Sequence, residues 1–349
     1  MENPSNVFAK ETEFQKLQFT GTATDYFGIW IVNIFLTVLT FGIYSAWAKV
    51  RRRRYFQGHT LLEGHGFGYH ATGKQIFLGR LLAFGLFALF VIPVIQVFAG
   101  LILFFVFPLL IHRSLRFNAR VTSYRNIRFT FVGTTKEAYK AFLLGPFLAT
   151  ISLGILAPIA NQWRQHYVGN NMMYGDRPFK TNIPIKSLYK IWLSAVGLTF
   201  IFVIINTLVI GIIAINDKNE GQSVYNLGLA LFDFFLLITY FGIFIVWFVY
   251  ALRIKNLAWS STILDNKHPI RLNLPWKRYL WITISNGVIS LITLGLMRPW
   301  AAIRFEKFRW EHTSIQFNGD LGEIISDVEK TTTPIAAEYL DIDGFDFGF

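Results

Sequence analysis

The stretch FGIYSAWAKVRRRRYF, residues 41–56, begins with apolar and aromatic residues and then contains four consecutive arginines. This boundary is typical of the cytoplasmic end of a membrane helix, where basic residues accumulate and tryptophan anchors the interface. A basic run can also bind nucleic acid, but nucleic-acid modules carry such residues on soluble domains with stacking aromatics. Because this run continues an apolar helix, the sequence predicts contact with anionic lipid headgroups and no nucleic-acid partner.

The composition of the whole chain indicates a membrane protein. Of its 349 residues, 53% are hydrophobic and only 15% are charged, whereas about a quarter of the residues in soluble domains are charged. The segments 76–111, 191–215 and 227–252 hold few charges, and they approach or exceed the roughly 20 residues that cross a bilayer. We therefore expect a polytopic helical membrane protein.

The first residues bear on where the N-terminus lies, and the absence of cysteine bears on which kinds of site the chain can form. MENPSNVFAKETEFQKLQFTG is polar and mixed in charge, so we expect no signal peptide and a cytoplasmic N-terminus. The chain contains no cysteine, which excludes disulfides and thiolate-based metal binding or catalysis. The net charge of +12 is consistent with basic residues that face anionic headgroups at the cytoplasmic surface.

The opening stretch recurs twice along the chain. It aligns with LGILAPIANQWRQHYV at 153–168 and with LGLMRPWAAIRFEKFR at 294–309, so that Gly42, Gly154 and Gly295 correspond. The offsets are 154 − 42 = 112 and 295 − 42 = 253. Agreement at constant offset across about forty positions predicts three internal repeat units.

Each repeat unit is expected to contain a short strand, an apolar helix, a glycine break, a basic amphipathic helix and a β-hairpin. Two long apolar segments between the units are expected to form transmembrane hairpins. The predicted fold class is therefore an all-α polytopic membrane protein with small β-hairpin elements. The predicted organisation is a polar N-terminal segment (1–13), repeat unit 1 (14–75), a transmembrane hairpin (76–113), repeat unit 2 (114–187), a second transmembrane hairpin (188–252), repeat unit 3 (253–322) and an acidic flexible tail (323–349).

The distribution of basic residues favours one topology. If all the apolar helices crossed the membrane, the basic residues near 164–190 and 253–278 would lie outside, against the positive-inside rule. If the three repeat units re-enter on the cytoplasmic side, every basic cluster lies inside. We therefore predict four spans, three re-entrant units and cytoplasmic termini at both ends. A 16-residue apolar helix is nearly long enough to cross, so the crossing alternative stays open.

The C-terminal region differs from the rest of the chain. Residues 320–349 include eight acidic residues and one lysine, which is typical of a solvated flexible segment. The alternative is that this tail docks on the basic cytoplasmic face of the same chain.

The glycine-rich segment GHTLLEGHGFGYHATG, residues 58–73, contains His59, Glu63, His65 and His70. Histidine and carboxylate are ordinary ligands of zinc or iron. The spacing matches no named metal motif, however, and the glycines indicate a hairpin turn. A polar structural hairpin is the preferred interpretation, with a metal site as the alternative. No cofactor is otherwise expected, although a phospholipid is a plausible bound molecule.

Polar residues inside apolar segments are further candidates. Asp233 lies within a predicted span, where a carboxylate is costly and often marks a proton or cation path; its position near the outer loop would also explain it. Asn33 and Asn286 correspond between the first and third units, and are expected to bond helix to helix or to line a pathway. The predicted headgroup contacts are Lys49, Arg51, Arg52, Arg53, Arg54, Arg164, Arg304, Lys307 and Arg309.

The segment TGTATDYFGIWIVNIFLTVLTFGIYSAWAKVRRRRYF, with the later LGILAPIANQW and LGLMRPWAAIRF, resembles the YjgN family of bacterial inner-membrane proteins. The resemblance extends to about residue 320. It implies a bacterial inner-membrane location, and it implies no reaction, substrate or catalytic residue.

Two functional hypotheses follow. The first, which the sequence favours, is a transport or channel-like protein whose pathway runs between the repeat units and past Asp233. The second is a lipid-interacting scaffold or bilayer-remodelling protein whose basic interface helices bind anionic phospholipids. The catalytic motifs of hydrolases, P-loop proteins and dinucleotide-binding enzymes are not found, which weakly disfavours an enzyme. The oligomeric state stays open, a homo-oligomer included.

Overall fold

The computed structural model describes residues 14–88, 93–216 and 222–319. The chain divides into two compact units, Ile183–Leu257 and the remainder, Met1–Asn182 with Ala258–Phe349. The predicted polar N-terminal segment (1–13) and the predicted acidic tail (323–349) lie outside the described residues.

An antiparallel sheet of 11 strands forms the centre of the larger unit, in the order β1-β11-β10-β9-β8-β7-β6-β5-β4-β3-β2. Strands β1 (Phe14–Lys16) and β2 (Gln18–Phe19) stand at opposite ends of this order, yet only Leu17 separates them along the chain. The N–H of Leu17 donates to the carbonyl oxygen of Thr313 at 3.0 Å, at the start of β11. One continuous stretch of chain therefore pairs with both ends of the sheet and nearly closes it into a barrel.

The other strands come in hairpins whose turns contain residues with positive φ. Glycine, asparagine and aspartate tolerate this conformation better than other residues, and they are frequent in tight β-turns. Each hairpin also pairs with the next one along the chain, for example Phe67 of β4 with Tyr124 of β5. The hairpins are β3 (Thr60–Leu62) with β4 (His65–Tyr69), β5 (Thr122–Tyr124) with β6 (Ile127–Phe131), β7 (Met172–Tyr174) with β8 (Arg177–Thr181), and β9 (Thr262–Leu264) with β10 (His268–Leu272), and β11 is Thr313–Gln316.

Pairs of helices connect the strands. In the third pair the first helix is divided by a π-helical turn, which is a frequent local irregularity of α-helices. The pairs, in chain order, are α1 (Ala23–Leu39) with α2 (Ser45–Gly58), α3 (Gly73–Ala88) with α4 (Pro93–Arg120), the series α5 (Thr135–Tyr139), η3 (Lys140–Leu144) and α6 (Gly145–Ile151) with α7 (Ala157–Asn170), α8 (Ile185–Asn216) with α9 (Gln222–Ser260), and α10 (Trp276–Ile292) with α11 (Arg298–Glu311).

Side chains fill the interior of the barrel. The core contains one or two residues from most strands, with Phe67, Phe129 and Phe179 packed against it. Two tyrosines bridge strands: the hydroxyl of Tyr124 donates to the carbonyl of Leu62 at 2.7 Å, and that of Tyr174 donates to the carbonyl of Tyr124 at 3.0 Å. Burial raises the pKa of Tyr124 to about 12. The described strands therefore enclose a packed core. The buried residues of this core are Leu17, Leu62, Tyr124, Ile127, Tyr174, Leu264, Ile270 and Ile315.

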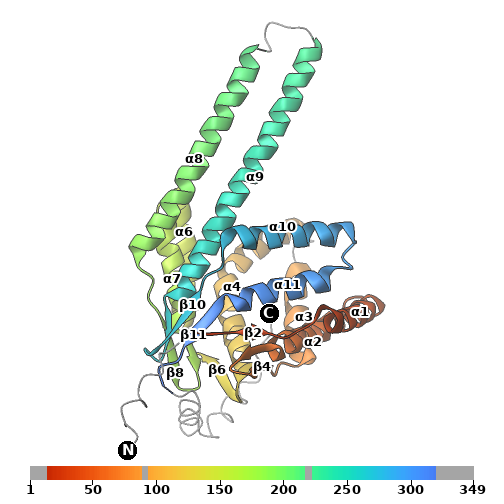
Figure 1. Cartoon of the computed structure of the whole chain (residues 1–349), viewed down its shortest axis with the longest axis vertical. Coiled ribbons are helices and arrows are strands. Elements are labelled where there is room, and N and C mark those ends of the chain that lie inside the picture. Colours follow the sequence, from red (N-terminus) through yellow and green to blue (C-terminus); the bar gives the residue numbers. More distant parts are fainter. Residues whose placement is uncertain (1–13, 89–92, 217–221, 320–349) are drawn as a thin grey trace, which may run out of the picture. The chain divides into compact units, whose positions relative to one another are not determined.

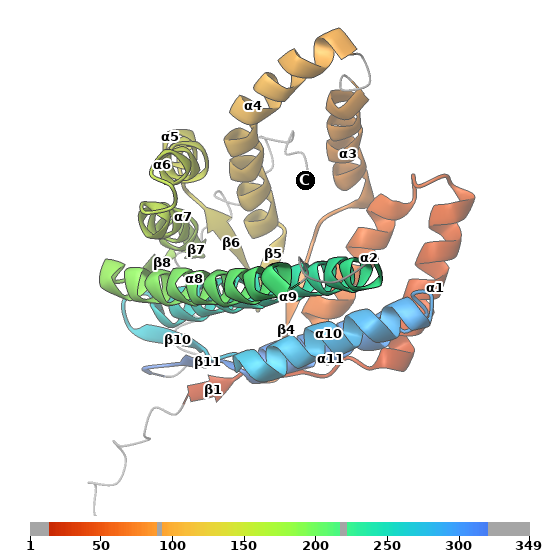
Figure 2. The same cartoon turned by 90° about the horizontal axis from the view of Figure 1, so that it is seen from above.

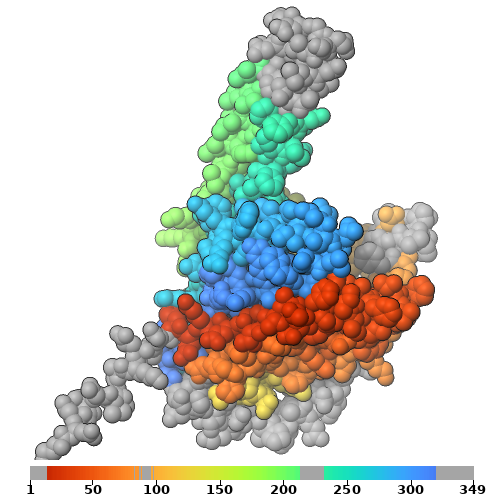
Figure 3. All heavy atoms as spheres, turned by 45° about the vertical axis from the view of Figure 1, so that its right-hand side comes forward, coloured from red at the N-terminus to blue at the C-terminus, as the bar shows by residue number. Residues whose placement is uncertain are grey.

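Within the larger unit, helices from the two ends of the chain pack together. Tyr26 of α1, Tyr55 of α2 and Ile303 of α11 share one apolar cluster, and Figure 3 shows the N-terminal helices in red beside the C-terminal ones in blue. Figures 1 and 2 show α10 beside α11. Helix α11 contacts α1, just as strand β11 pairs with β1. The two ends of the chain therefore meet through helices as well as through strands.

The predicted all-α fold with small β-hairpin elements is wrong. The hairpins do form, but their strands pair with one another across the intervening helix pairs to make a single sheet. Strands of two to five residues are too short to show a clear alternation of polar and apolar residues. Pairing between distant strands leaves no local signal, and this explains why the sequence did not reveal the barrel.

Among the residues that the structure describes, three helical segments are long and apolar enough to cross a membrane, judged by length and composition: Phe98–Arg120, Ile185–Ile212 and Phe232–Ser260. The prediction had four such spans. The missing one corresponds to α3, which is described over 16 residues, Gly73–Ala88, before the segment 89–92 that lies outside the description. In the smaller unit, α8 and α9 run side by side (Figure 1).

A close approach of two backbones supplies a test of the barrel. A Cβ placed on Gly66 of β4 would collide with the carbonyl oxygen of Gly58, the last residue of α2. We expect Gly66→Ala to destabilise the protein by about 1–3 kcal/mol, because neither backbone can yield without breaking the sheet or the helix end. Thermal unfolding of the detergent-solubilised protein, followed by circular dichroism, measures the change.

The matched control is Gly28→Ala. Gly28 lies in α1, and a Cβ there meets nothing within 4 Å, so alanine should leave the stability unchanged or raise it by up to about 1 kcal/mol. If both variants unfold at the temperature of the parent protein, β4 does not lie against the end of α2 as described.

Candidate functional site

The turns at the ends of α1, α6 and α10 have the same backbone conformation. Their two central residues have φ of 49° and 91° at Phe41-Gly42, 52° and 90° at Leu153-Gly154, and 50° and 90° at Leu294-Gly295. In each turn the glycine N–H donates at 2.7 Å to the carbonyl five residues earlier, on Thr37, Ala149 or Ser290. This is the hydrogen bond of a Schellman-type helix end, which requires a left-handed residue.

The residue before each of these turns also starts the next helix. The hydroxyl oxygens of Thr40, Ser152 and Thr293 accept hydrogen bonds from backbone N–H groups four residues later, at 2.9, 3.0 and 3.2 Å. Such a hydroxyl satisfies one of the donors that every helix start leaves unpaired. Each turn is thereby a defined helix–turn–helix junction rather than a loose loop.

The left-handed residue of each turn is unusual. Glycine is the ordinary occupant of this conformation, and a residue with a Cβ is less stable there by about 1–2 kcal/mol. Here the positions hold Phe41, Leu153 and Leu294, whose side chains are 98%, 92% and 94% exposed. Such exposure means that packing against the described part of the chain does little to compensate the strain at these three positions. Strained residues that the surrounding fold does not explain are candidates for function.

Further apolar side chains surround each exposed turn. They come from the last turn of the first helix and the first residues after the break, and together with the central residue they form what we call the apolar tips. An exposed apolar patch of this kind marks a surface that contacts a membrane or another protein. The tip residues are Val38, Leu39, Phe41 and Ile43 in the first tip, Ile151, Leu153 and Ile155 in the second, and Leu291, Ile292, Leu294 and Leu296 in the third.

The predicted headgroup cations follow the tips on α2, α7 and α11, and they divide into two groups. Arg51, Arg52, Arg53, Arg164 and Lys307 are exposed. Arg54 is also exposed, but its guanidinium donates to the carbonyls of Tyr69 and Ala71 at 3.3 Å. Lys49, Arg304 and Arg309 are partly buried; Arg304 donates to Ser285 Oγ at 2.7 Å and Asn286 Oδ1 at 3.2 Å, and Arg309 pairs with Glu306 at 2.6 Å.

Positive charges crowd around α2. Burial lowers the pKa of Lys49, and the neighbouring charges of Arg80 and Arg53 lower it further. Arg53 also acts on Arg309 of α11, whose pKa is lowered mainly by its burial. Clustered cations of this kind attract anions, and each cation repels its neighbours until an anion is bound.

The polar candidates within the apolar helices have different surroundings. Asn286 donates from Nδ2 to the carbonyl of Ala301 at 2.9 Å, so it joins α10 to α11. Asn33 is buried in α1 with its Oδ1 unpaired, which leaves an acceptor in an apolar helix layer. Asp233 is exposed, at the second residue of the apolar segment Phe232–Ser260.

The histidine-rich segment forms β3, its turn and β4. His59 Nδ1 contacts the carbonyl of Tyr55 at 2.8 Å, His65 Nδ1 that of Glu63 at 2.9 Å, and His70 Nε2 contacts Ser123 Oγ at 2.7 Å. Within residues 14–88, 93–216 and 222–319, no three histidine or acidic side chains are arranged to hold a metal ion. The four residues are thus separated along the hairpin and do not converge.

The repeated sequence pattern indicated the glycines of the turns, but it did not indicate that the residues before them are left-handed and exposed. The alignment contained the signal, since an apolar residue precedes the glycine in all three copies, at 41, 153 and 294. It also missed Arg80, Arg116 and Arg120, which lie outside the aligned basic runs. Their relation to the other basic residues depends on how α3 and α4 pack, which no local pattern reveals.

Comparison with known proteins gives relatives but no solved structure: no solved structure matches. The chain is 25% identical to "Inner membrane protein YjgN" of Salmonella typhimurium, over 92% of this chain and 93% of the relative. It is 23% identical to the protein of the same name from Escherichia coli K12, over 88% and 89% of the two chains. A family model described as "Bacterial protein of unknown function (DUF898)" matches residues 14–342. Together with the three apolar helices, these relatives support an inner-membrane protein, and the chain belongs to the bacterial DUF898 family.

Proposed function

We propose that this protein is a lipid-interacting protein of the bacterial inner membrane. In this proposal the apolar tips insert into the hydrocarbon of the cytoplasmic leaflet, and the cations of the following helices bind anionic phospholipid headgroups. The apolar segments of α4, α8 and α9 anchor the chain in the bilayer. In this proposal the α3–α4 pair and the α8–α9 pair each enter and leave the bilayer, so both termini are cytoplasmic.

The single observation that carries this proposal is the strained, exposed apolar residue at the centre of each tip. Phe41, Leu153 and Leu294 combine a positive φ with almost complete exposure among the described residues. Transfer of such a side chain from water to hydrocarbon contributes about 1.5–3 kcal/mol, which is enough to offset about 1–2 kcal/mol of left-handed strain. A bilayer therefore supplies the stabilisation that the fold itself lacks.

The spacing between tip and cations supports insertion into one leaflet. Along α2, which begins at Ser45, a rise of about 1.5 Å per residue puts Arg51 roughly 9 Å beyond the helix start. One leaflet contributes about 15 Å of hydrocarbon. With the tip in the acyl chains, the arginines lie at headgroup depth, where phosphates are abundant.

We further propose that repeat units 1, 2 and 3 are copies of one ancestral unit that presents its tip as a re-entrant helix pair. The constant offsets and the matching turn geometry support this. The same order of strand, helix pair and strand also occurs around α3–α4 and α8–α9, which supports a relation among all five helix pairs.

The transport hypothesis receives less support. Its pathway was expected between the repeat units, near Asp233. The barrel core beneath the helix pairs is filled with side chains, and Asp233 is exposed on an apolar helix. We therefore prefer the lipid-binding hypothesis, which the sequence ranked second.

The absence of native cysteine makes the tips directly testable. Single variants Phe41→Cys, Leu153→Cys and Leu294→Cys are reconstituted into nanodiscs, which leave both membrane faces open to a water-soluble maleimide. We expect each thiol to react at least tenfold more slowly than Gln15→Cys, an exposed position on β1, because the thiolate that reacts does not form in hydrocarbon.

In dodecyl sulfate all four variants should react at the same rate, which controls for intrinsic reactivity. Tip thiols that react in nanodiscs as fast as Gln15→Cys would show that the tips lie in water, and the proposal would fail.

The headgroup contact is tested by the triple variant Arg51→Gln/Arg52→Gln/Arg53→Gln. Each cation near an anionic surface contributes up to about 1 kcal/mol, so we expect the preference for phosphatidylglycerol over phosphatidylcholine to fall by about tenfold or more. Native mass spectrometry of the purified protein measures the lipids retained.

The control is Arg54→Gln, from the same run of four arginines, because Arg54 bonds to backbone carbonyls. A reduction in Arg54→Gln equal to that of the triple variant would contradict the assignment.

A further inference from the structure

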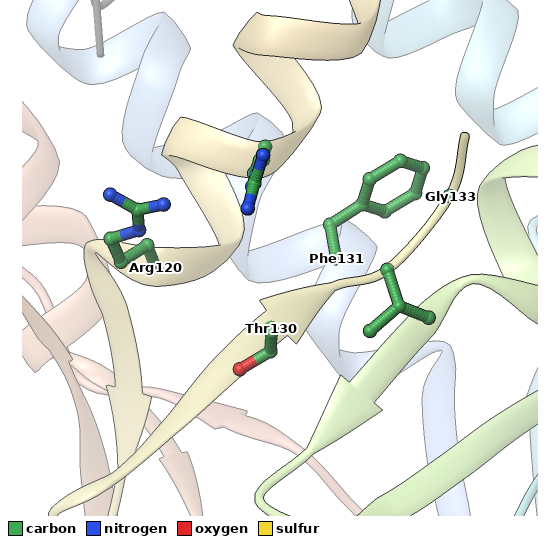
Figure 4. Close-up of a pocket in the computed structure, with 6 residues that line it drawn as sticks. Arg120, Thr130, Phe131 and Gly133 are labelled. Carbon is green, nitrogen blue, oxygen red and sulfur yellow. The ribbon is translucent and has the colours of Figure 1, made fainter. Parts of the chain in front are cut away.

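A pocket lies between α4 and β6, away from the three tips. Its volume is about 270 Å³ and it is lined by Arg116, Arg120, Thr130, Phe131, Val132 and Gly133. Figure 4 shows Arg120 at the end of α4, with Thr130, Phe131 and Gly133 along β6 and the segment that follows it. Neither the lipid contacts predicted from the sequence nor the tips include any of these residues.

The two arginines reach the pocket from one face of α4. Residues four apart on a helix are neighbours on its surface, so His112, Arg116 and Arg120 form a single row. The first residue of this row, His112, is buried and contacts the Tyr167 hydroxyl through Nδ1 at 2.9 Å. That contact attaches α4 to α7 and determines which face of α4 is turned toward β6.

The floor of the pocket is apolar and held in place. The Phe131 ring is buried and packs against Tyr167 and His112, with ring centroids 5.4 and 6.2 Å apart. A Cβ on Gly133 would meet the Phe131 ring at 2.7 Å, so the absence of a side chain there lets the ring occupy its place. The floor therefore does not depend on a ligand for its shape.

The lining combines cationic and hydroxyl donors with an apolar floor. Arginine guanidinium groups bind phosphate through paired N–H donors, and the Thr130 hydroxyl adds a further donor. The lining thus combines two guanidinium groups and a hydroxyl with an aromatic floor.

We propose that this pocket binds the phosphate of an anionic phospholipid headgroup or of a free phosphate compound, between Arg116, Arg120 and Thr130, with the adjoining apolar part of the ligand on Phe131 and Val132. The choice of a lipid as the source rests on the proposed function, whereas the phosphate chemistry rests on the pocket alone. The apolar segment Phe98–Arg120 of α4 ends at Arg120, so the pocket lies at the end of a candidate span, where headgroups are available.

The test uses the purified full-length protein and native mass spectrometry with dioleoyl phosphatidic acid as probe. We expect the double variant Arg116→Gln/Arg120→Gln to bind the probe at least tenfold more weakly. The matched control is Arg113→Gln, which removes the same charge from the same helix at an exposed position outside the pocket; it should change binding by less than twofold. The variant Arg116→Lys/Arg120→Lys keeps both charges and tests the role of paired donors if the glutamine variant does not fold.

A second arm distinguishes the source of the phosphate. If millimolar inorganic phosphate displaces the lipid from the parent protein but has no effect in the double variant, the pocket accepts phosphate by itself. If phosphatidic acid binds in an arginine-dependent manner and inorganic phosphate does not compete, the pocket requires the lipid.

Equal losses in Arg113→Gln and the double variant, or unchanged binding in both the glutamine and the lysine variants, would overturn the proposal. This outcome is independent of the thiol measurement at the tips, because tips in water would leave arginine-dependent phosphate binding intact.

Discussion

The pairing of residues 14–19 with both β11 and β3 is the interaction on which the larger unit depends. Without it, the sheet would be reduced to β3–β11 and would have two open edges, each a row of unpaired backbone groups. The Leu17 N–H bonded to Thr313 joins chain segments almost 300 residues apart, and the Leu17 side chain enters the barrel core at the same point. Closure of the sheet brings α11 against α1, so the first and last helix pairs become neighbours.

A filled barrel with helix pairs attached to its strands explains how a small sheet can support several exposed apolar turns. In the larger unit the second helices of the pairs pack against strands, as α2 does with β4, α4 with β6 and α7 with β8. The barrel acts as a rigid support, because its core is packed with aromatic and branched side chains. Rigid support matters at the tips, where a left-handed Phe41 or Leu294 is maintained only by a helix end that is itself well defined.

Some polar side chains of the helices join one helix to another, whereas others present exposed charge. Asn286 and Arg304 bind each other and join α10 to α11, whereas Arg51, Arg52 and Arg53 are exposed. The same basic motif therefore serves packing in one copy and exposes its charge in another.

The amino-acid sequence by itself determined the membrane class, because 53% hydrophobic residues and long uncharged runs need no tertiary information to interpret. It also located the helix breaks at Gly42, Gly154 and Gly295, because a left-handed backbone at a helix end is a local requirement. Only the tertiary structure decided that the short hairpins form one barrel, since pairing between distant strands leaves no local period. It likewise decided that Arg116 and Arg120 share a pocket with Thr130, because that juxtaposition depends on the contact of α4 with β6 and on the bond between His112 and Tyr167.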